Sequence, residues 1–229
     1  MSYFESRLPI NIENFKKIKK SLDFCEKLRI KNVIIEPINP IQKIPLRVKK
    51  EIEKLANINI FYRINLKATD IGNFKKKINN YNDFSDVISI ESLNRDVLLN
   101  AAKDSRVQII SFSDPEIIKK LSSGIISLSK QNKSFIEFSL APIMESDKKV
   151  QSKNLRNLYR YTQLAIKLKA NFIISGNFYN IFDYRHPRAL ISICNSLLEI
   201  PLNIAKKAFG LNPKLLLEEI QKHKEDLNN

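Results

Sequence analysis

Val33-Ile-Ile35 and, near the other end of the chain, Phe172-Ile-Ile174 are unbroken runs of β-branched and aromatic residues. A strand with one face in water alternates apolar and polar residues, whereas a strand buried on both faces is apolar throughout. Both runs therefore predict strands of a parallel sheet that is covered on its two faces.

The same alternation of short β-branched runs and longer amphipathic stretches continues along the chain. Eight βα-type units in 229 residues is the count of a TIM barrel. We therefore predict an α/β fold, a TIM-like (β/α) barrel forming a single domain over residues 1–229. The eight predicted strands are Ser2–Phe4, Asn32–Ile35, Asn59–Leu66, Asp86–Ile90, Val107–Ile110, Gly124–Ser127, Phe135–Ser139 and Asn171–Ser175.

Helical patterns separate these strands, and three of them follow a polar residue suited to an N-cap, namely Asp70, Asn94 and Asp114. After the last strand, three segments each carry a proline where a helix can start, which predicts extra C-terminal helices over about residues 187–225. These segments are Pro187–Leu198, Pro201–Phe209 and Pro213–His223. The earlier helices are predicted at Ile12–Leu28, Leu46–Ala56, Gly72–Asn79, Asn94–Lys103, Pro115–Leu121 and Lys148–Lys169.

Composition argues against several classes of enzyme. Four glycines form no GxGxxG or P-loop motif, so a phosphate-gripping loop is not indicated. Two histidines are too few for the His/Asp clusters of metal-dependent hydrolases. Cys25 and Cys194 lie in apolar helical patterns and are predicted to be buried free thiols. The chain shows no signal peptide and no stretch near the ~20 apolar residues of a membrane span, so we expect a cytoplasmic protein without a membrane partner.

The net charge is strongly positive. The chain has 39 Lys and Arg against 24 Asp and Glu, which gives a formal charge of +15. Such a field attracts polyanions, although a lysine-rich proteome makes many proteins basic without this role. The charge is concentrated, since residues 148–188 hold nine basic residues and one acid, Asp183.

The helix predicted at Lys148–Lys169 carries most of this excess. At ~100° per residue, its cations fall within about 60° of one another, and Leu155, Leu158 and Thr162 lie roughly opposite. A solvated helix face usually mixes charges of both signs, and here no acid occurs between Asp147 and Asp183. We therefore favour contact with phosphates over simple solvation. The residues of this basic face are Lys149, Lys153, Arg156, Arg160 and Lys167.

Phe178–Arg188, which reads FYNIFDYRHPR, follows the last predicted strand. Arg185 and Arg188 are predicted to bind RNA, because an arginine fork suits phosphate. The aromatic residues are open to two interpretations. Tyr179, Phe182 and Tyr184 either stack on unpaired bases or, for the last two, plug the barrel mouth, and Phe178 is expected in the core.

One catalytic alternative comes from Glu5, Glu36 and Glu91, each of which follows a predicted strand. Barrel enzymes place their chemistry at the carboxyl ends of the strands, and three carboxylates there could hold Mg²⁺ or Mn²⁺. The alternative function is then a metal-dependent barrel phosphoesterase. The opposing interpretation is that these carboxylates pair with lysines or cap helices.

Four ordered motifs and the tail resemble the barrel subunit of archaeal and eukaryotic ribonuclease P, protein component 3. The motifs cover roughly the last 95 residues, and the first 115 agree only in layout, including Val87–Glu91 followed by Arg95. His186 and Ala189 depart from the family's small hydroxyl and acid, while both arginines are kept. The motifs are Phe135-Ile-Glu-Phe-Ser-Leu-Ala-Pro-Ile143, the basic helix from Lys148, Ile173-Ile-Ser-Gly-Asn177, Tyr184-Arg-His-Pro-Arg-Ala-Leu190 and, in the tail, Asn212-Pro-Lys-Leu-Leu-Leu-Glu218.

The resemblance implies a TIM-like barrel that carries no catalytic residues or metal site of its own. In this family the RNA subunit holds Mg²⁺ and cleaves precursor tRNA to free the mature 5′ end. The barrel protein joins a small α/β protein subunit, and both stabilise the ribonuclease P RNA, so precursor tRNA is a partner only indirectly. Arg185, Arg188 and, more weakly, Arg95 carry over as RNA contacts. A nucleic-acid-binding barrel outside ribonuclease P is a further alternative.

Overall fold

The computed structural model describes residues 2–38, 44–81 and 86–228, with side chains up to Gln221. In these ranges, seven parallel strands are hydrogen-bonded in chain order, from β1 to β7. Their alternation with helices confirms the predicted TIM-like fold. The strands are β1 (Phe4–Ile10), β2 (Asn32–Pro37), β3 (Asn59–Lys67), β4 (Val87–Glu91), β5 (Ile109–Phe112), β6 (Phe135–Ser139) and β7 (Phe172–Ser175).

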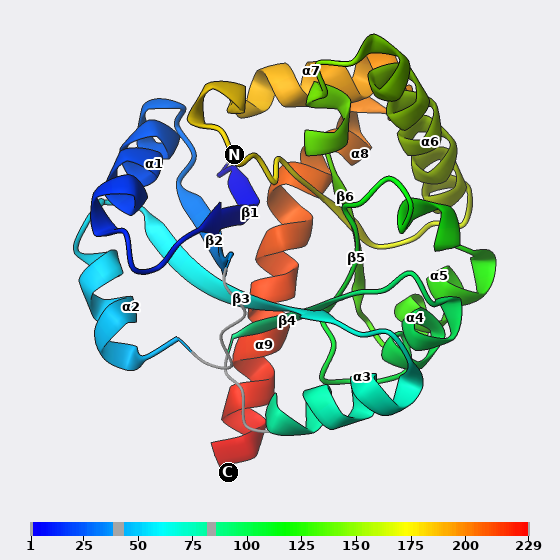
Figure 1. Cartoon of the computed structure of the whole chain (residues 1–229), viewed down its shortest axis with the longest axis horizontal. Coiled ribbons are helices and arrows are strands. Elements are labelled where there is room, and N and C mark those ends of the chain that lie inside the picture. Colours follow the sequence, from blue (N-terminus) through cyan, green and yellow to red (C-terminus); the bar gives the residue numbers. More distant parts are fainter. Residues whose placement is uncertain (1, 39–43, 82–85, 229) are drawn as a thin grey trace.

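Helices surround these strands, with α1 and α6 on opposite sides of the barrel (Figure 1). No helix in the described ranges combines the length and the apolar character that crossing a membrane would require. The helices are α1 (Phe15–Lys27), α2 (Leu46–Glu53), α3 (Ile71–Ile78), α4 (Arg95–Ala101), α5 (Ser123–Gln131), α6 (Lys148–Lys167), α7 (Pro187–Leu198), α8 (Leu202–Lys206) and α9 (Asn212–Asn228).

The predicted strand at Gly124–Ser127 is wrong, because this segment lies in α5. Its β-branched residues suggested a strand, but their burial follows the period of a helix. Ile125, Ile126 and Ser129 are buried together, and the Ser122 side chain accepts a hydrogen bond from the Ile125 amide as the N-cap.

The barrel is nearly closed between β7 and β1. Among the described residues no strand ladder joins these two, and the π-helical segment η5 (Lys207–Leu211) contacts both. The Glu5 carboxylate of β1 spans the same seam, since its Oε1 accepts a hydrogen bond of 2.9 Å from the Gly176 amide. A helical segment and one carboxylate therefore stand where an eighth strand would close the barrel.

The predicted element boundaries hold to different degrees. Asp70 and Asn94 cap α3 and α4, as predicted. Asp114 accepts hydrogen bonds from two amides, but the segment that follows it forms only a 3₁₀ turn, η2 (Ile118–Lys120). The first strand runs over Phe4–Ile10 and extends well beyond the predicted Ser2–Phe4. The C-terminal helices and the two buried free thiols are confirmed.

The interior of the barrel has two layers that follow from the period of two along each strand. At the amino ends of the strands the inward residues are apolar and pack against Leu216 and Ile220 of α9, which closes this end. Two residues further on, the inward residues are polar and buried. The successive pairs, apolar then polar, are Ile34 and Glu36, Phe61 and Arg63, Val87 and Ser89, Ile109 and Ser111, Phe135 and Glu137, and Ile173 and Ser175.

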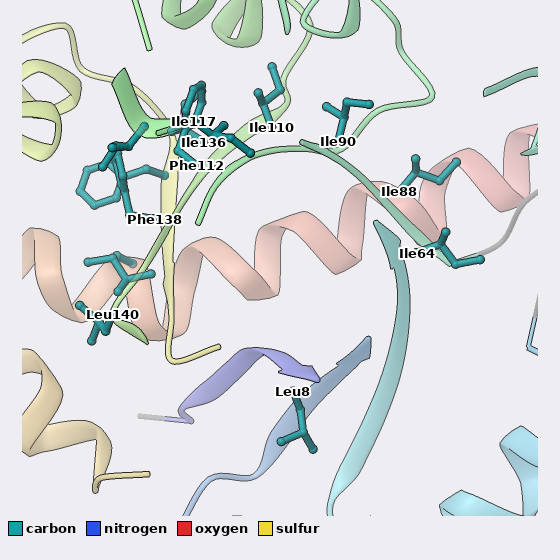
Figure 2. Close-up of a cluster of buried hydrophobic side chains, with 14 of the residues drawn as sticks. Leu8, Ile64, Ile88, Ile90, Ile110, Phe112, Ile117, Ile136, Phe138 and Leu140 are labelled. Atoms are coloured by element: carbon teal, nitrogen blue, oxygen red, sulfur yellow. The ribbon is translucent and has the colours of Figure 1, made fainter. Parts of the chain in front are cut away.

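The outward faces of the strands form the main hydrophobic core with the surrounding helices. Figure 2 shows part of this cluster, including Ile88, Ile90, Ile110 and Phe112 from β4 and β5. The core thus lies between the sheet and the helices, and the polar layer is left inside the barrel.

Candidate nucleic-acid interface

Helix α6 exposes the predicted basic face. Asp147 caps the helix by accepting hydrogen bonds from the Lys149 and Val150 amides at 2.8 and 3.2 Å. Asn154, Leu158, Thr162 and Ala165 are buried, so the opposite face packs on the barrel as predicted. All five cations of the basic face are exposed, and from the first to the last the helix advances about 27 Å at 1.5 Å per residue.

Removing this cap gives the first testable prediction. Asp147→Ala leaves two amides of the first turn without an acceptor, so we expect the free energy of unfolding to fall by about 1 kcal/mol. Urea unfolding measures the loss. Ser146→Ala, on the neighbouring exposed residue, is the matched control and should change stability by under about 0.5 kcal/mol. An equal loss in both variants would contradict the capping role.

The charges of the basic face are not neutralised by neighbouring acids. In the described part of the chain, none of its five residues forms an ion pair. The Arg160 guanidinium lies 5.6 Å from the centre of the Tyr161 ring. Glu116 interacts with Lys153, but its carboxylate is hydrogen-bonded to Lys119 at 2.6 and 2.7 Å. The face is therefore available to an external polyanion.

The loop between β7 and α7 is anchored by two buried rings. Phe178 and Tyr184 make an edge-to-face contact at 5.4 Å, and the Tyr184 hydroxyl donates to the Phe178 carbonyl at 2.8 Å. Phe178 is in the core, as predicted. The interpretation that Phe182 and Tyr184 together plug the mouth is wrong, because Phe182 is 74% exposed. Tyr179 is exposed as well.

The predicted arginines lie on the surface. Arg185 is exposed, and its guanidinium donates to the carbonyls of Phe182 and Tyr184, so part of its role is to hold the loop. Arg188 is exposed in the first turn of α7, where His186 caps its amide at 3.2 Å. Arg95 is exposed at the start of α4. Each follows the carboxyl end of a strand, and their contact with RNA stays a prediction.

The three strand-end glutamates lie inside the barrel, within the strands and not after them. Arg7, on β1, connects two of them. Its Nη2 lies 2.7 Å from Glu36 Oε1, and its Nη1 lies 2.6 Å from Glu91 Oε1. Glu5 instead accepts hydrogen bonds from two backbone amides, those of Arg7 and Gly176.

A second arginine completes this ionic layer. Arg63 is fully buried and binds both oxygens of Glu137, at 2.7 and 2.9 Å. Its Nε also lies 3.0 Å from Glu36 Oε2. Sequence reasoning missed Arg7, Arg63 and Glu137. The signal was present in the polar residues that stand two positions after an apolar residue in almost every strand.

The charges of the layer act on one another. Burial would raise the pKa of Glu91, but the charge and hydrogen bond of Arg7 outweigh it and hold that pKa at about 2. Burial also opposes ionisation of Glu137, and Arg63 and Arg7 keep its pKa below the usual range. No cation in the described ranges pairs with Glu5, and burial raises the pKa of this carboxyl to about 7. Glu36 and Glu91 are thus tied to a guanidinium, and no group of three His, Cys, Asp or Glu in the described ranges is arranged to hold a metal ion.

The raised pKa of Glu5 predicts a dependence of stability on pH. Between the unfolded pKa of 4.5 and the folded pKa of about 7, the folded state binds a proton that the unfolded state lacks. The contribution of Glu5 is complete below pH 4.5 and is lost as pH rises through 7. Glu5→Gln cannot ionise, so we expect its stability relative to the parent to rise by about 3 kcal/mol from pH 4 to pH 8. Urea unfolding at several pH values measures this difference, and parallel curves would contradict it.

The fold and the exposed cations define a TIM-like barrel with a basic outer face and an ion-paired interior. The sequence model of RNase P subunit p30 matches residues 4–225. The chain therefore belongs to this family and is a protein subunit of ribonuclease P.

Two solved structures have a similar fold. A chain in the cryo-EM structure of archaeal ribonuclease P with mature tRNA has a TM-score of 0.74 and 14% identity, over 98% of this chain and 92% of that chain. A. niger ochratoxinase has a TM-score of 0.59 and 9% identity, over 94% of this chain and 71% of that chain. No curated protein sequence matches the chain. At identities this low, the two structures show a similar fold and nothing about activity or partners.

Proposed function

We propose that this chain binds the catalytic RNA of ribonuclease P through the basic face of α6 and the arginines beside the strand ends, and supports cleavage of precursor tRNA in the cytoplasm without catalysing it. The observation that carries the proposal is the five exposed cations of α6, none of which has an ion-pair partner in the described ranges.

The proposed mechanism is electrostatic. Phosphates that folded RNA brings together repel one another, and cations on a rigid barrel reduce this repulsion while condensed counterions are released. Helix α6 suits this task because it packs along its length on the barrel through buried residues such as Leu158 and Ala165. The lysines and arginines are therefore held in a fixed row, so little conformational entropy is lost in ordering them when the RNA binds.

The interior supports a structural role for the strand-end carboxylates. A general base or a metal ligand needs free oxygen lone pairs. Glu36 pairs with Arg7 through Oε1 and with Arg63 Nε, at 3.0 Å, through Oε2. Glu91 pairs with Arg7 and also accepts a hydrogen bond from Ser111 at 3.1 Å. In this proposal the Mg²⁺ that cleavage requires is held by the RNA. A small α/β protein subunit is the proposed protein partner.

Reconstitution tests this function. Ribonuclease P RNA and the other protein subunits are combined with and without this chain, and cleavage of precursor tRNA is followed at limiting Mg²⁺. We expect activity to depend on this chain only when the small subunit is present. Hydrolysis of a phosphodiester by this chain alone with Mn²⁺, abolished by Glu36→Gln, would overturn the proposal in favour of a metal-dependent phosphoesterase.

A further inference from the structure

A pocket of about 540 Å³ opens at the carboxyl ends of β1, β2 and β3. We call it the mouth pocket. The residues of its lining that matter here are Arg7, Glu36, Asn65, Lys67, Lys77 and Tyr179. Small-molecule sites measure ~300–1,000 Å³, and barrels bind their ligands at this end. The mouth pocket has the size and the position of a ligand site. The binding of RNA along the basic face of α6 does not explain this pocket.

The floor of the mouth pocket is polar and charged. Glu36 is 7% exposed; its Oε1 pairs with Arg7 at 2.7 Å, and its Oε2 lies 3.0 Å from Arg63 Nε. Arg7 is 3% exposed and pairs with Glu91 as well. Arg7, Glu36 and Asn65 therefore give the pocket a polar floor, which suits a polar ligand better than an apolar one.

An aromatic ring stands at the edge of the same pocket. Tyr179 is 63% exposed although the residue before it, Phe178, is buried and anchors the loop. Tyr179 lines the mouth pocket together with Arg7 and Glu36, so its side chain lies on the side of the ionic layer. An exposed ring beside a polar floor suits stacking on a planar polar group.

Two lysines supply positive charge at the rim. Lys77 donates to the Lys67 carbonyl at 2.5 Å, so α3 and the end of β3 bring the two residues together. Neither ammonium group forms an ion pair within the described ranges, and Lys67 is exposed. An inorganic anion would use the lysines but not the ring, and a neutral sugar would not need the lysines. A nucleotide uses the ring, the lysines and the polar floor at once.

We propose that the mouth pocket binds a single nucleotide, with its base against Tyr179 and its phosphate at Lys67 and Lys77. This inference rests on the proposed function, because it takes the nucleotide to be an unpaired residue of the bound RNA. A free nucleotide has the same chemistry, and the experiment separates the two sources.

Calorimetric titration of the whole chain with adenosine and cytidine 5′-monophosphates and with single-stranded ribotrinucleotides tests the site. We expect the trinucleotides to bind, and Tyr179→Ala to weaken them about 10-fold, in keeping with the loss of one base–aromatic stack. Tyr179→Phe keeps the ring and should bind like the parent. Phe182→Ala removes another exposed ring of the same loop, one that does not line the pocket, and it should have no effect.

Binding of the trinucleotides together with the paired effects of Tyr179→Ala and Tyr179→Phe supports the site. If the monophosphates bind as tightly as the trinucleotides, the site holds and its ligand is a free nucleotide. No binding of either, or equal losses in Tyr179→Ala and Phe182→Ala, overturns it. These outcomes are independent of α6. Affinity for the full RNA is measured in parallel with the Lys149→Gln and Lys153→Gln variants, and a loss of that affinity reports on the proposed function alone.

Discussion

Replacing Arg63 with methionine is expected to lower the free energy of unfolding by about 3–5 kcal/mol, the usual cost of leaving a buried charge without its partner. Arg63 and Glu137 are both fully buried, and two hydrogen bonds of 2.7 and 2.9 Å join them. Without Arg63, the cation that remains for Glu137 is Arg7, whose Nη1 lies at 3.8 Å and which already serves Glu36 and Glu91.

Two variants separate the buried charge from the loss of a side chain. Arg63→Met combined with Glu137→Gln removes both charges, so it should be more stable than Arg63→Met alone. Arg47→Met breaks the exposed Arg47–Glu51 pair, where the N···O distance is 3.2 Å, and should cost under about 1 kcal/mol. Urea unfolding of the three variants measures these differences. A cost for Arg63→Met as small as that for Arg47→Met would show that the ionic layer does not depend on this pair.

Removing four cations from α6 is expected to have the largest effect on RNA binding. The variant carries Lys149→Gln, Lys153→Gln, Arg156→Gln and Arg160→Gln. Affinity falls as salt rises, and each lost phosphate contact makes the slope of log affinity against log salt shallower by about 0.9. We therefore expect the slope of the variant to be shallower by about 3–4. The advantage of the parent protein over the variant should then shrink about 100-fold between 50 and 200 mM salt.

Helix α1 offers a control of equal charge, with its exposed Lys16, Lys17, Lys19 and Lys20. It lies across the barrel from α6 (Figure 1) and also carries Asp23 and Glu26, so its charges are mixed. Changing these four lysines to Gln should leave most of the affinity and the slope in place. Equal losses in both variants would mean that binding follows the net charge of the protein and not the face of α6.

The layout of the barrel could be predicted because burial on both faces leaves a direct mark in the sequence. Runs such as Val33–Ile35 and Phe172–Ile174 are strands in the structure. The same signal failed at Gly124–Ser127, where β-branched residues belong to a short helix. There the buried positions, Ile125, Ile126 and Ser129, have helical spacing, and this period outweighs the strand preference of the individual residues.

The pairing within the ionic layer could not be predicted, because its partners meet only when the barrel forms. Arg7 and Glu91 are 84 positions apart, and Arg63 and Glu137 are 74 apart. Each charged residue alone in a strand is typical of a side chain that faces water. The sequence offers exposed lysines as possible partners for Glu5, Glu36 and Glu91, whereas the structure pairs Glu36 and Glu91 with the buried Arg7.

The basic face was easier to predict, since all its residues lie on one helix and the period of 3.6 places them together. The role of the following loop depended on tertiary structure. Phe178 and Tyr184 turn inward and pack against each other, and this leaves the side chains of Tyr179 and Phe182 exposed. The spacing of aromatic residues along the loop does not distinguish these two pairs.

Directed hydroxyl-radical probing tests most directly whether the RNA lies along α6. Cys25 and Cys194 are fully buried, so an iron chelate can be attached to one introduced cysteine. Ser152→Cys places the chelate on an exposed position of α6 without removing a cation, and Lys19→Cys places it on α1. With ribonuclease P RNA bound, we predict strand scission from the chelate on α6 and none from that on α1. Scission from α1 alone would contradict the account.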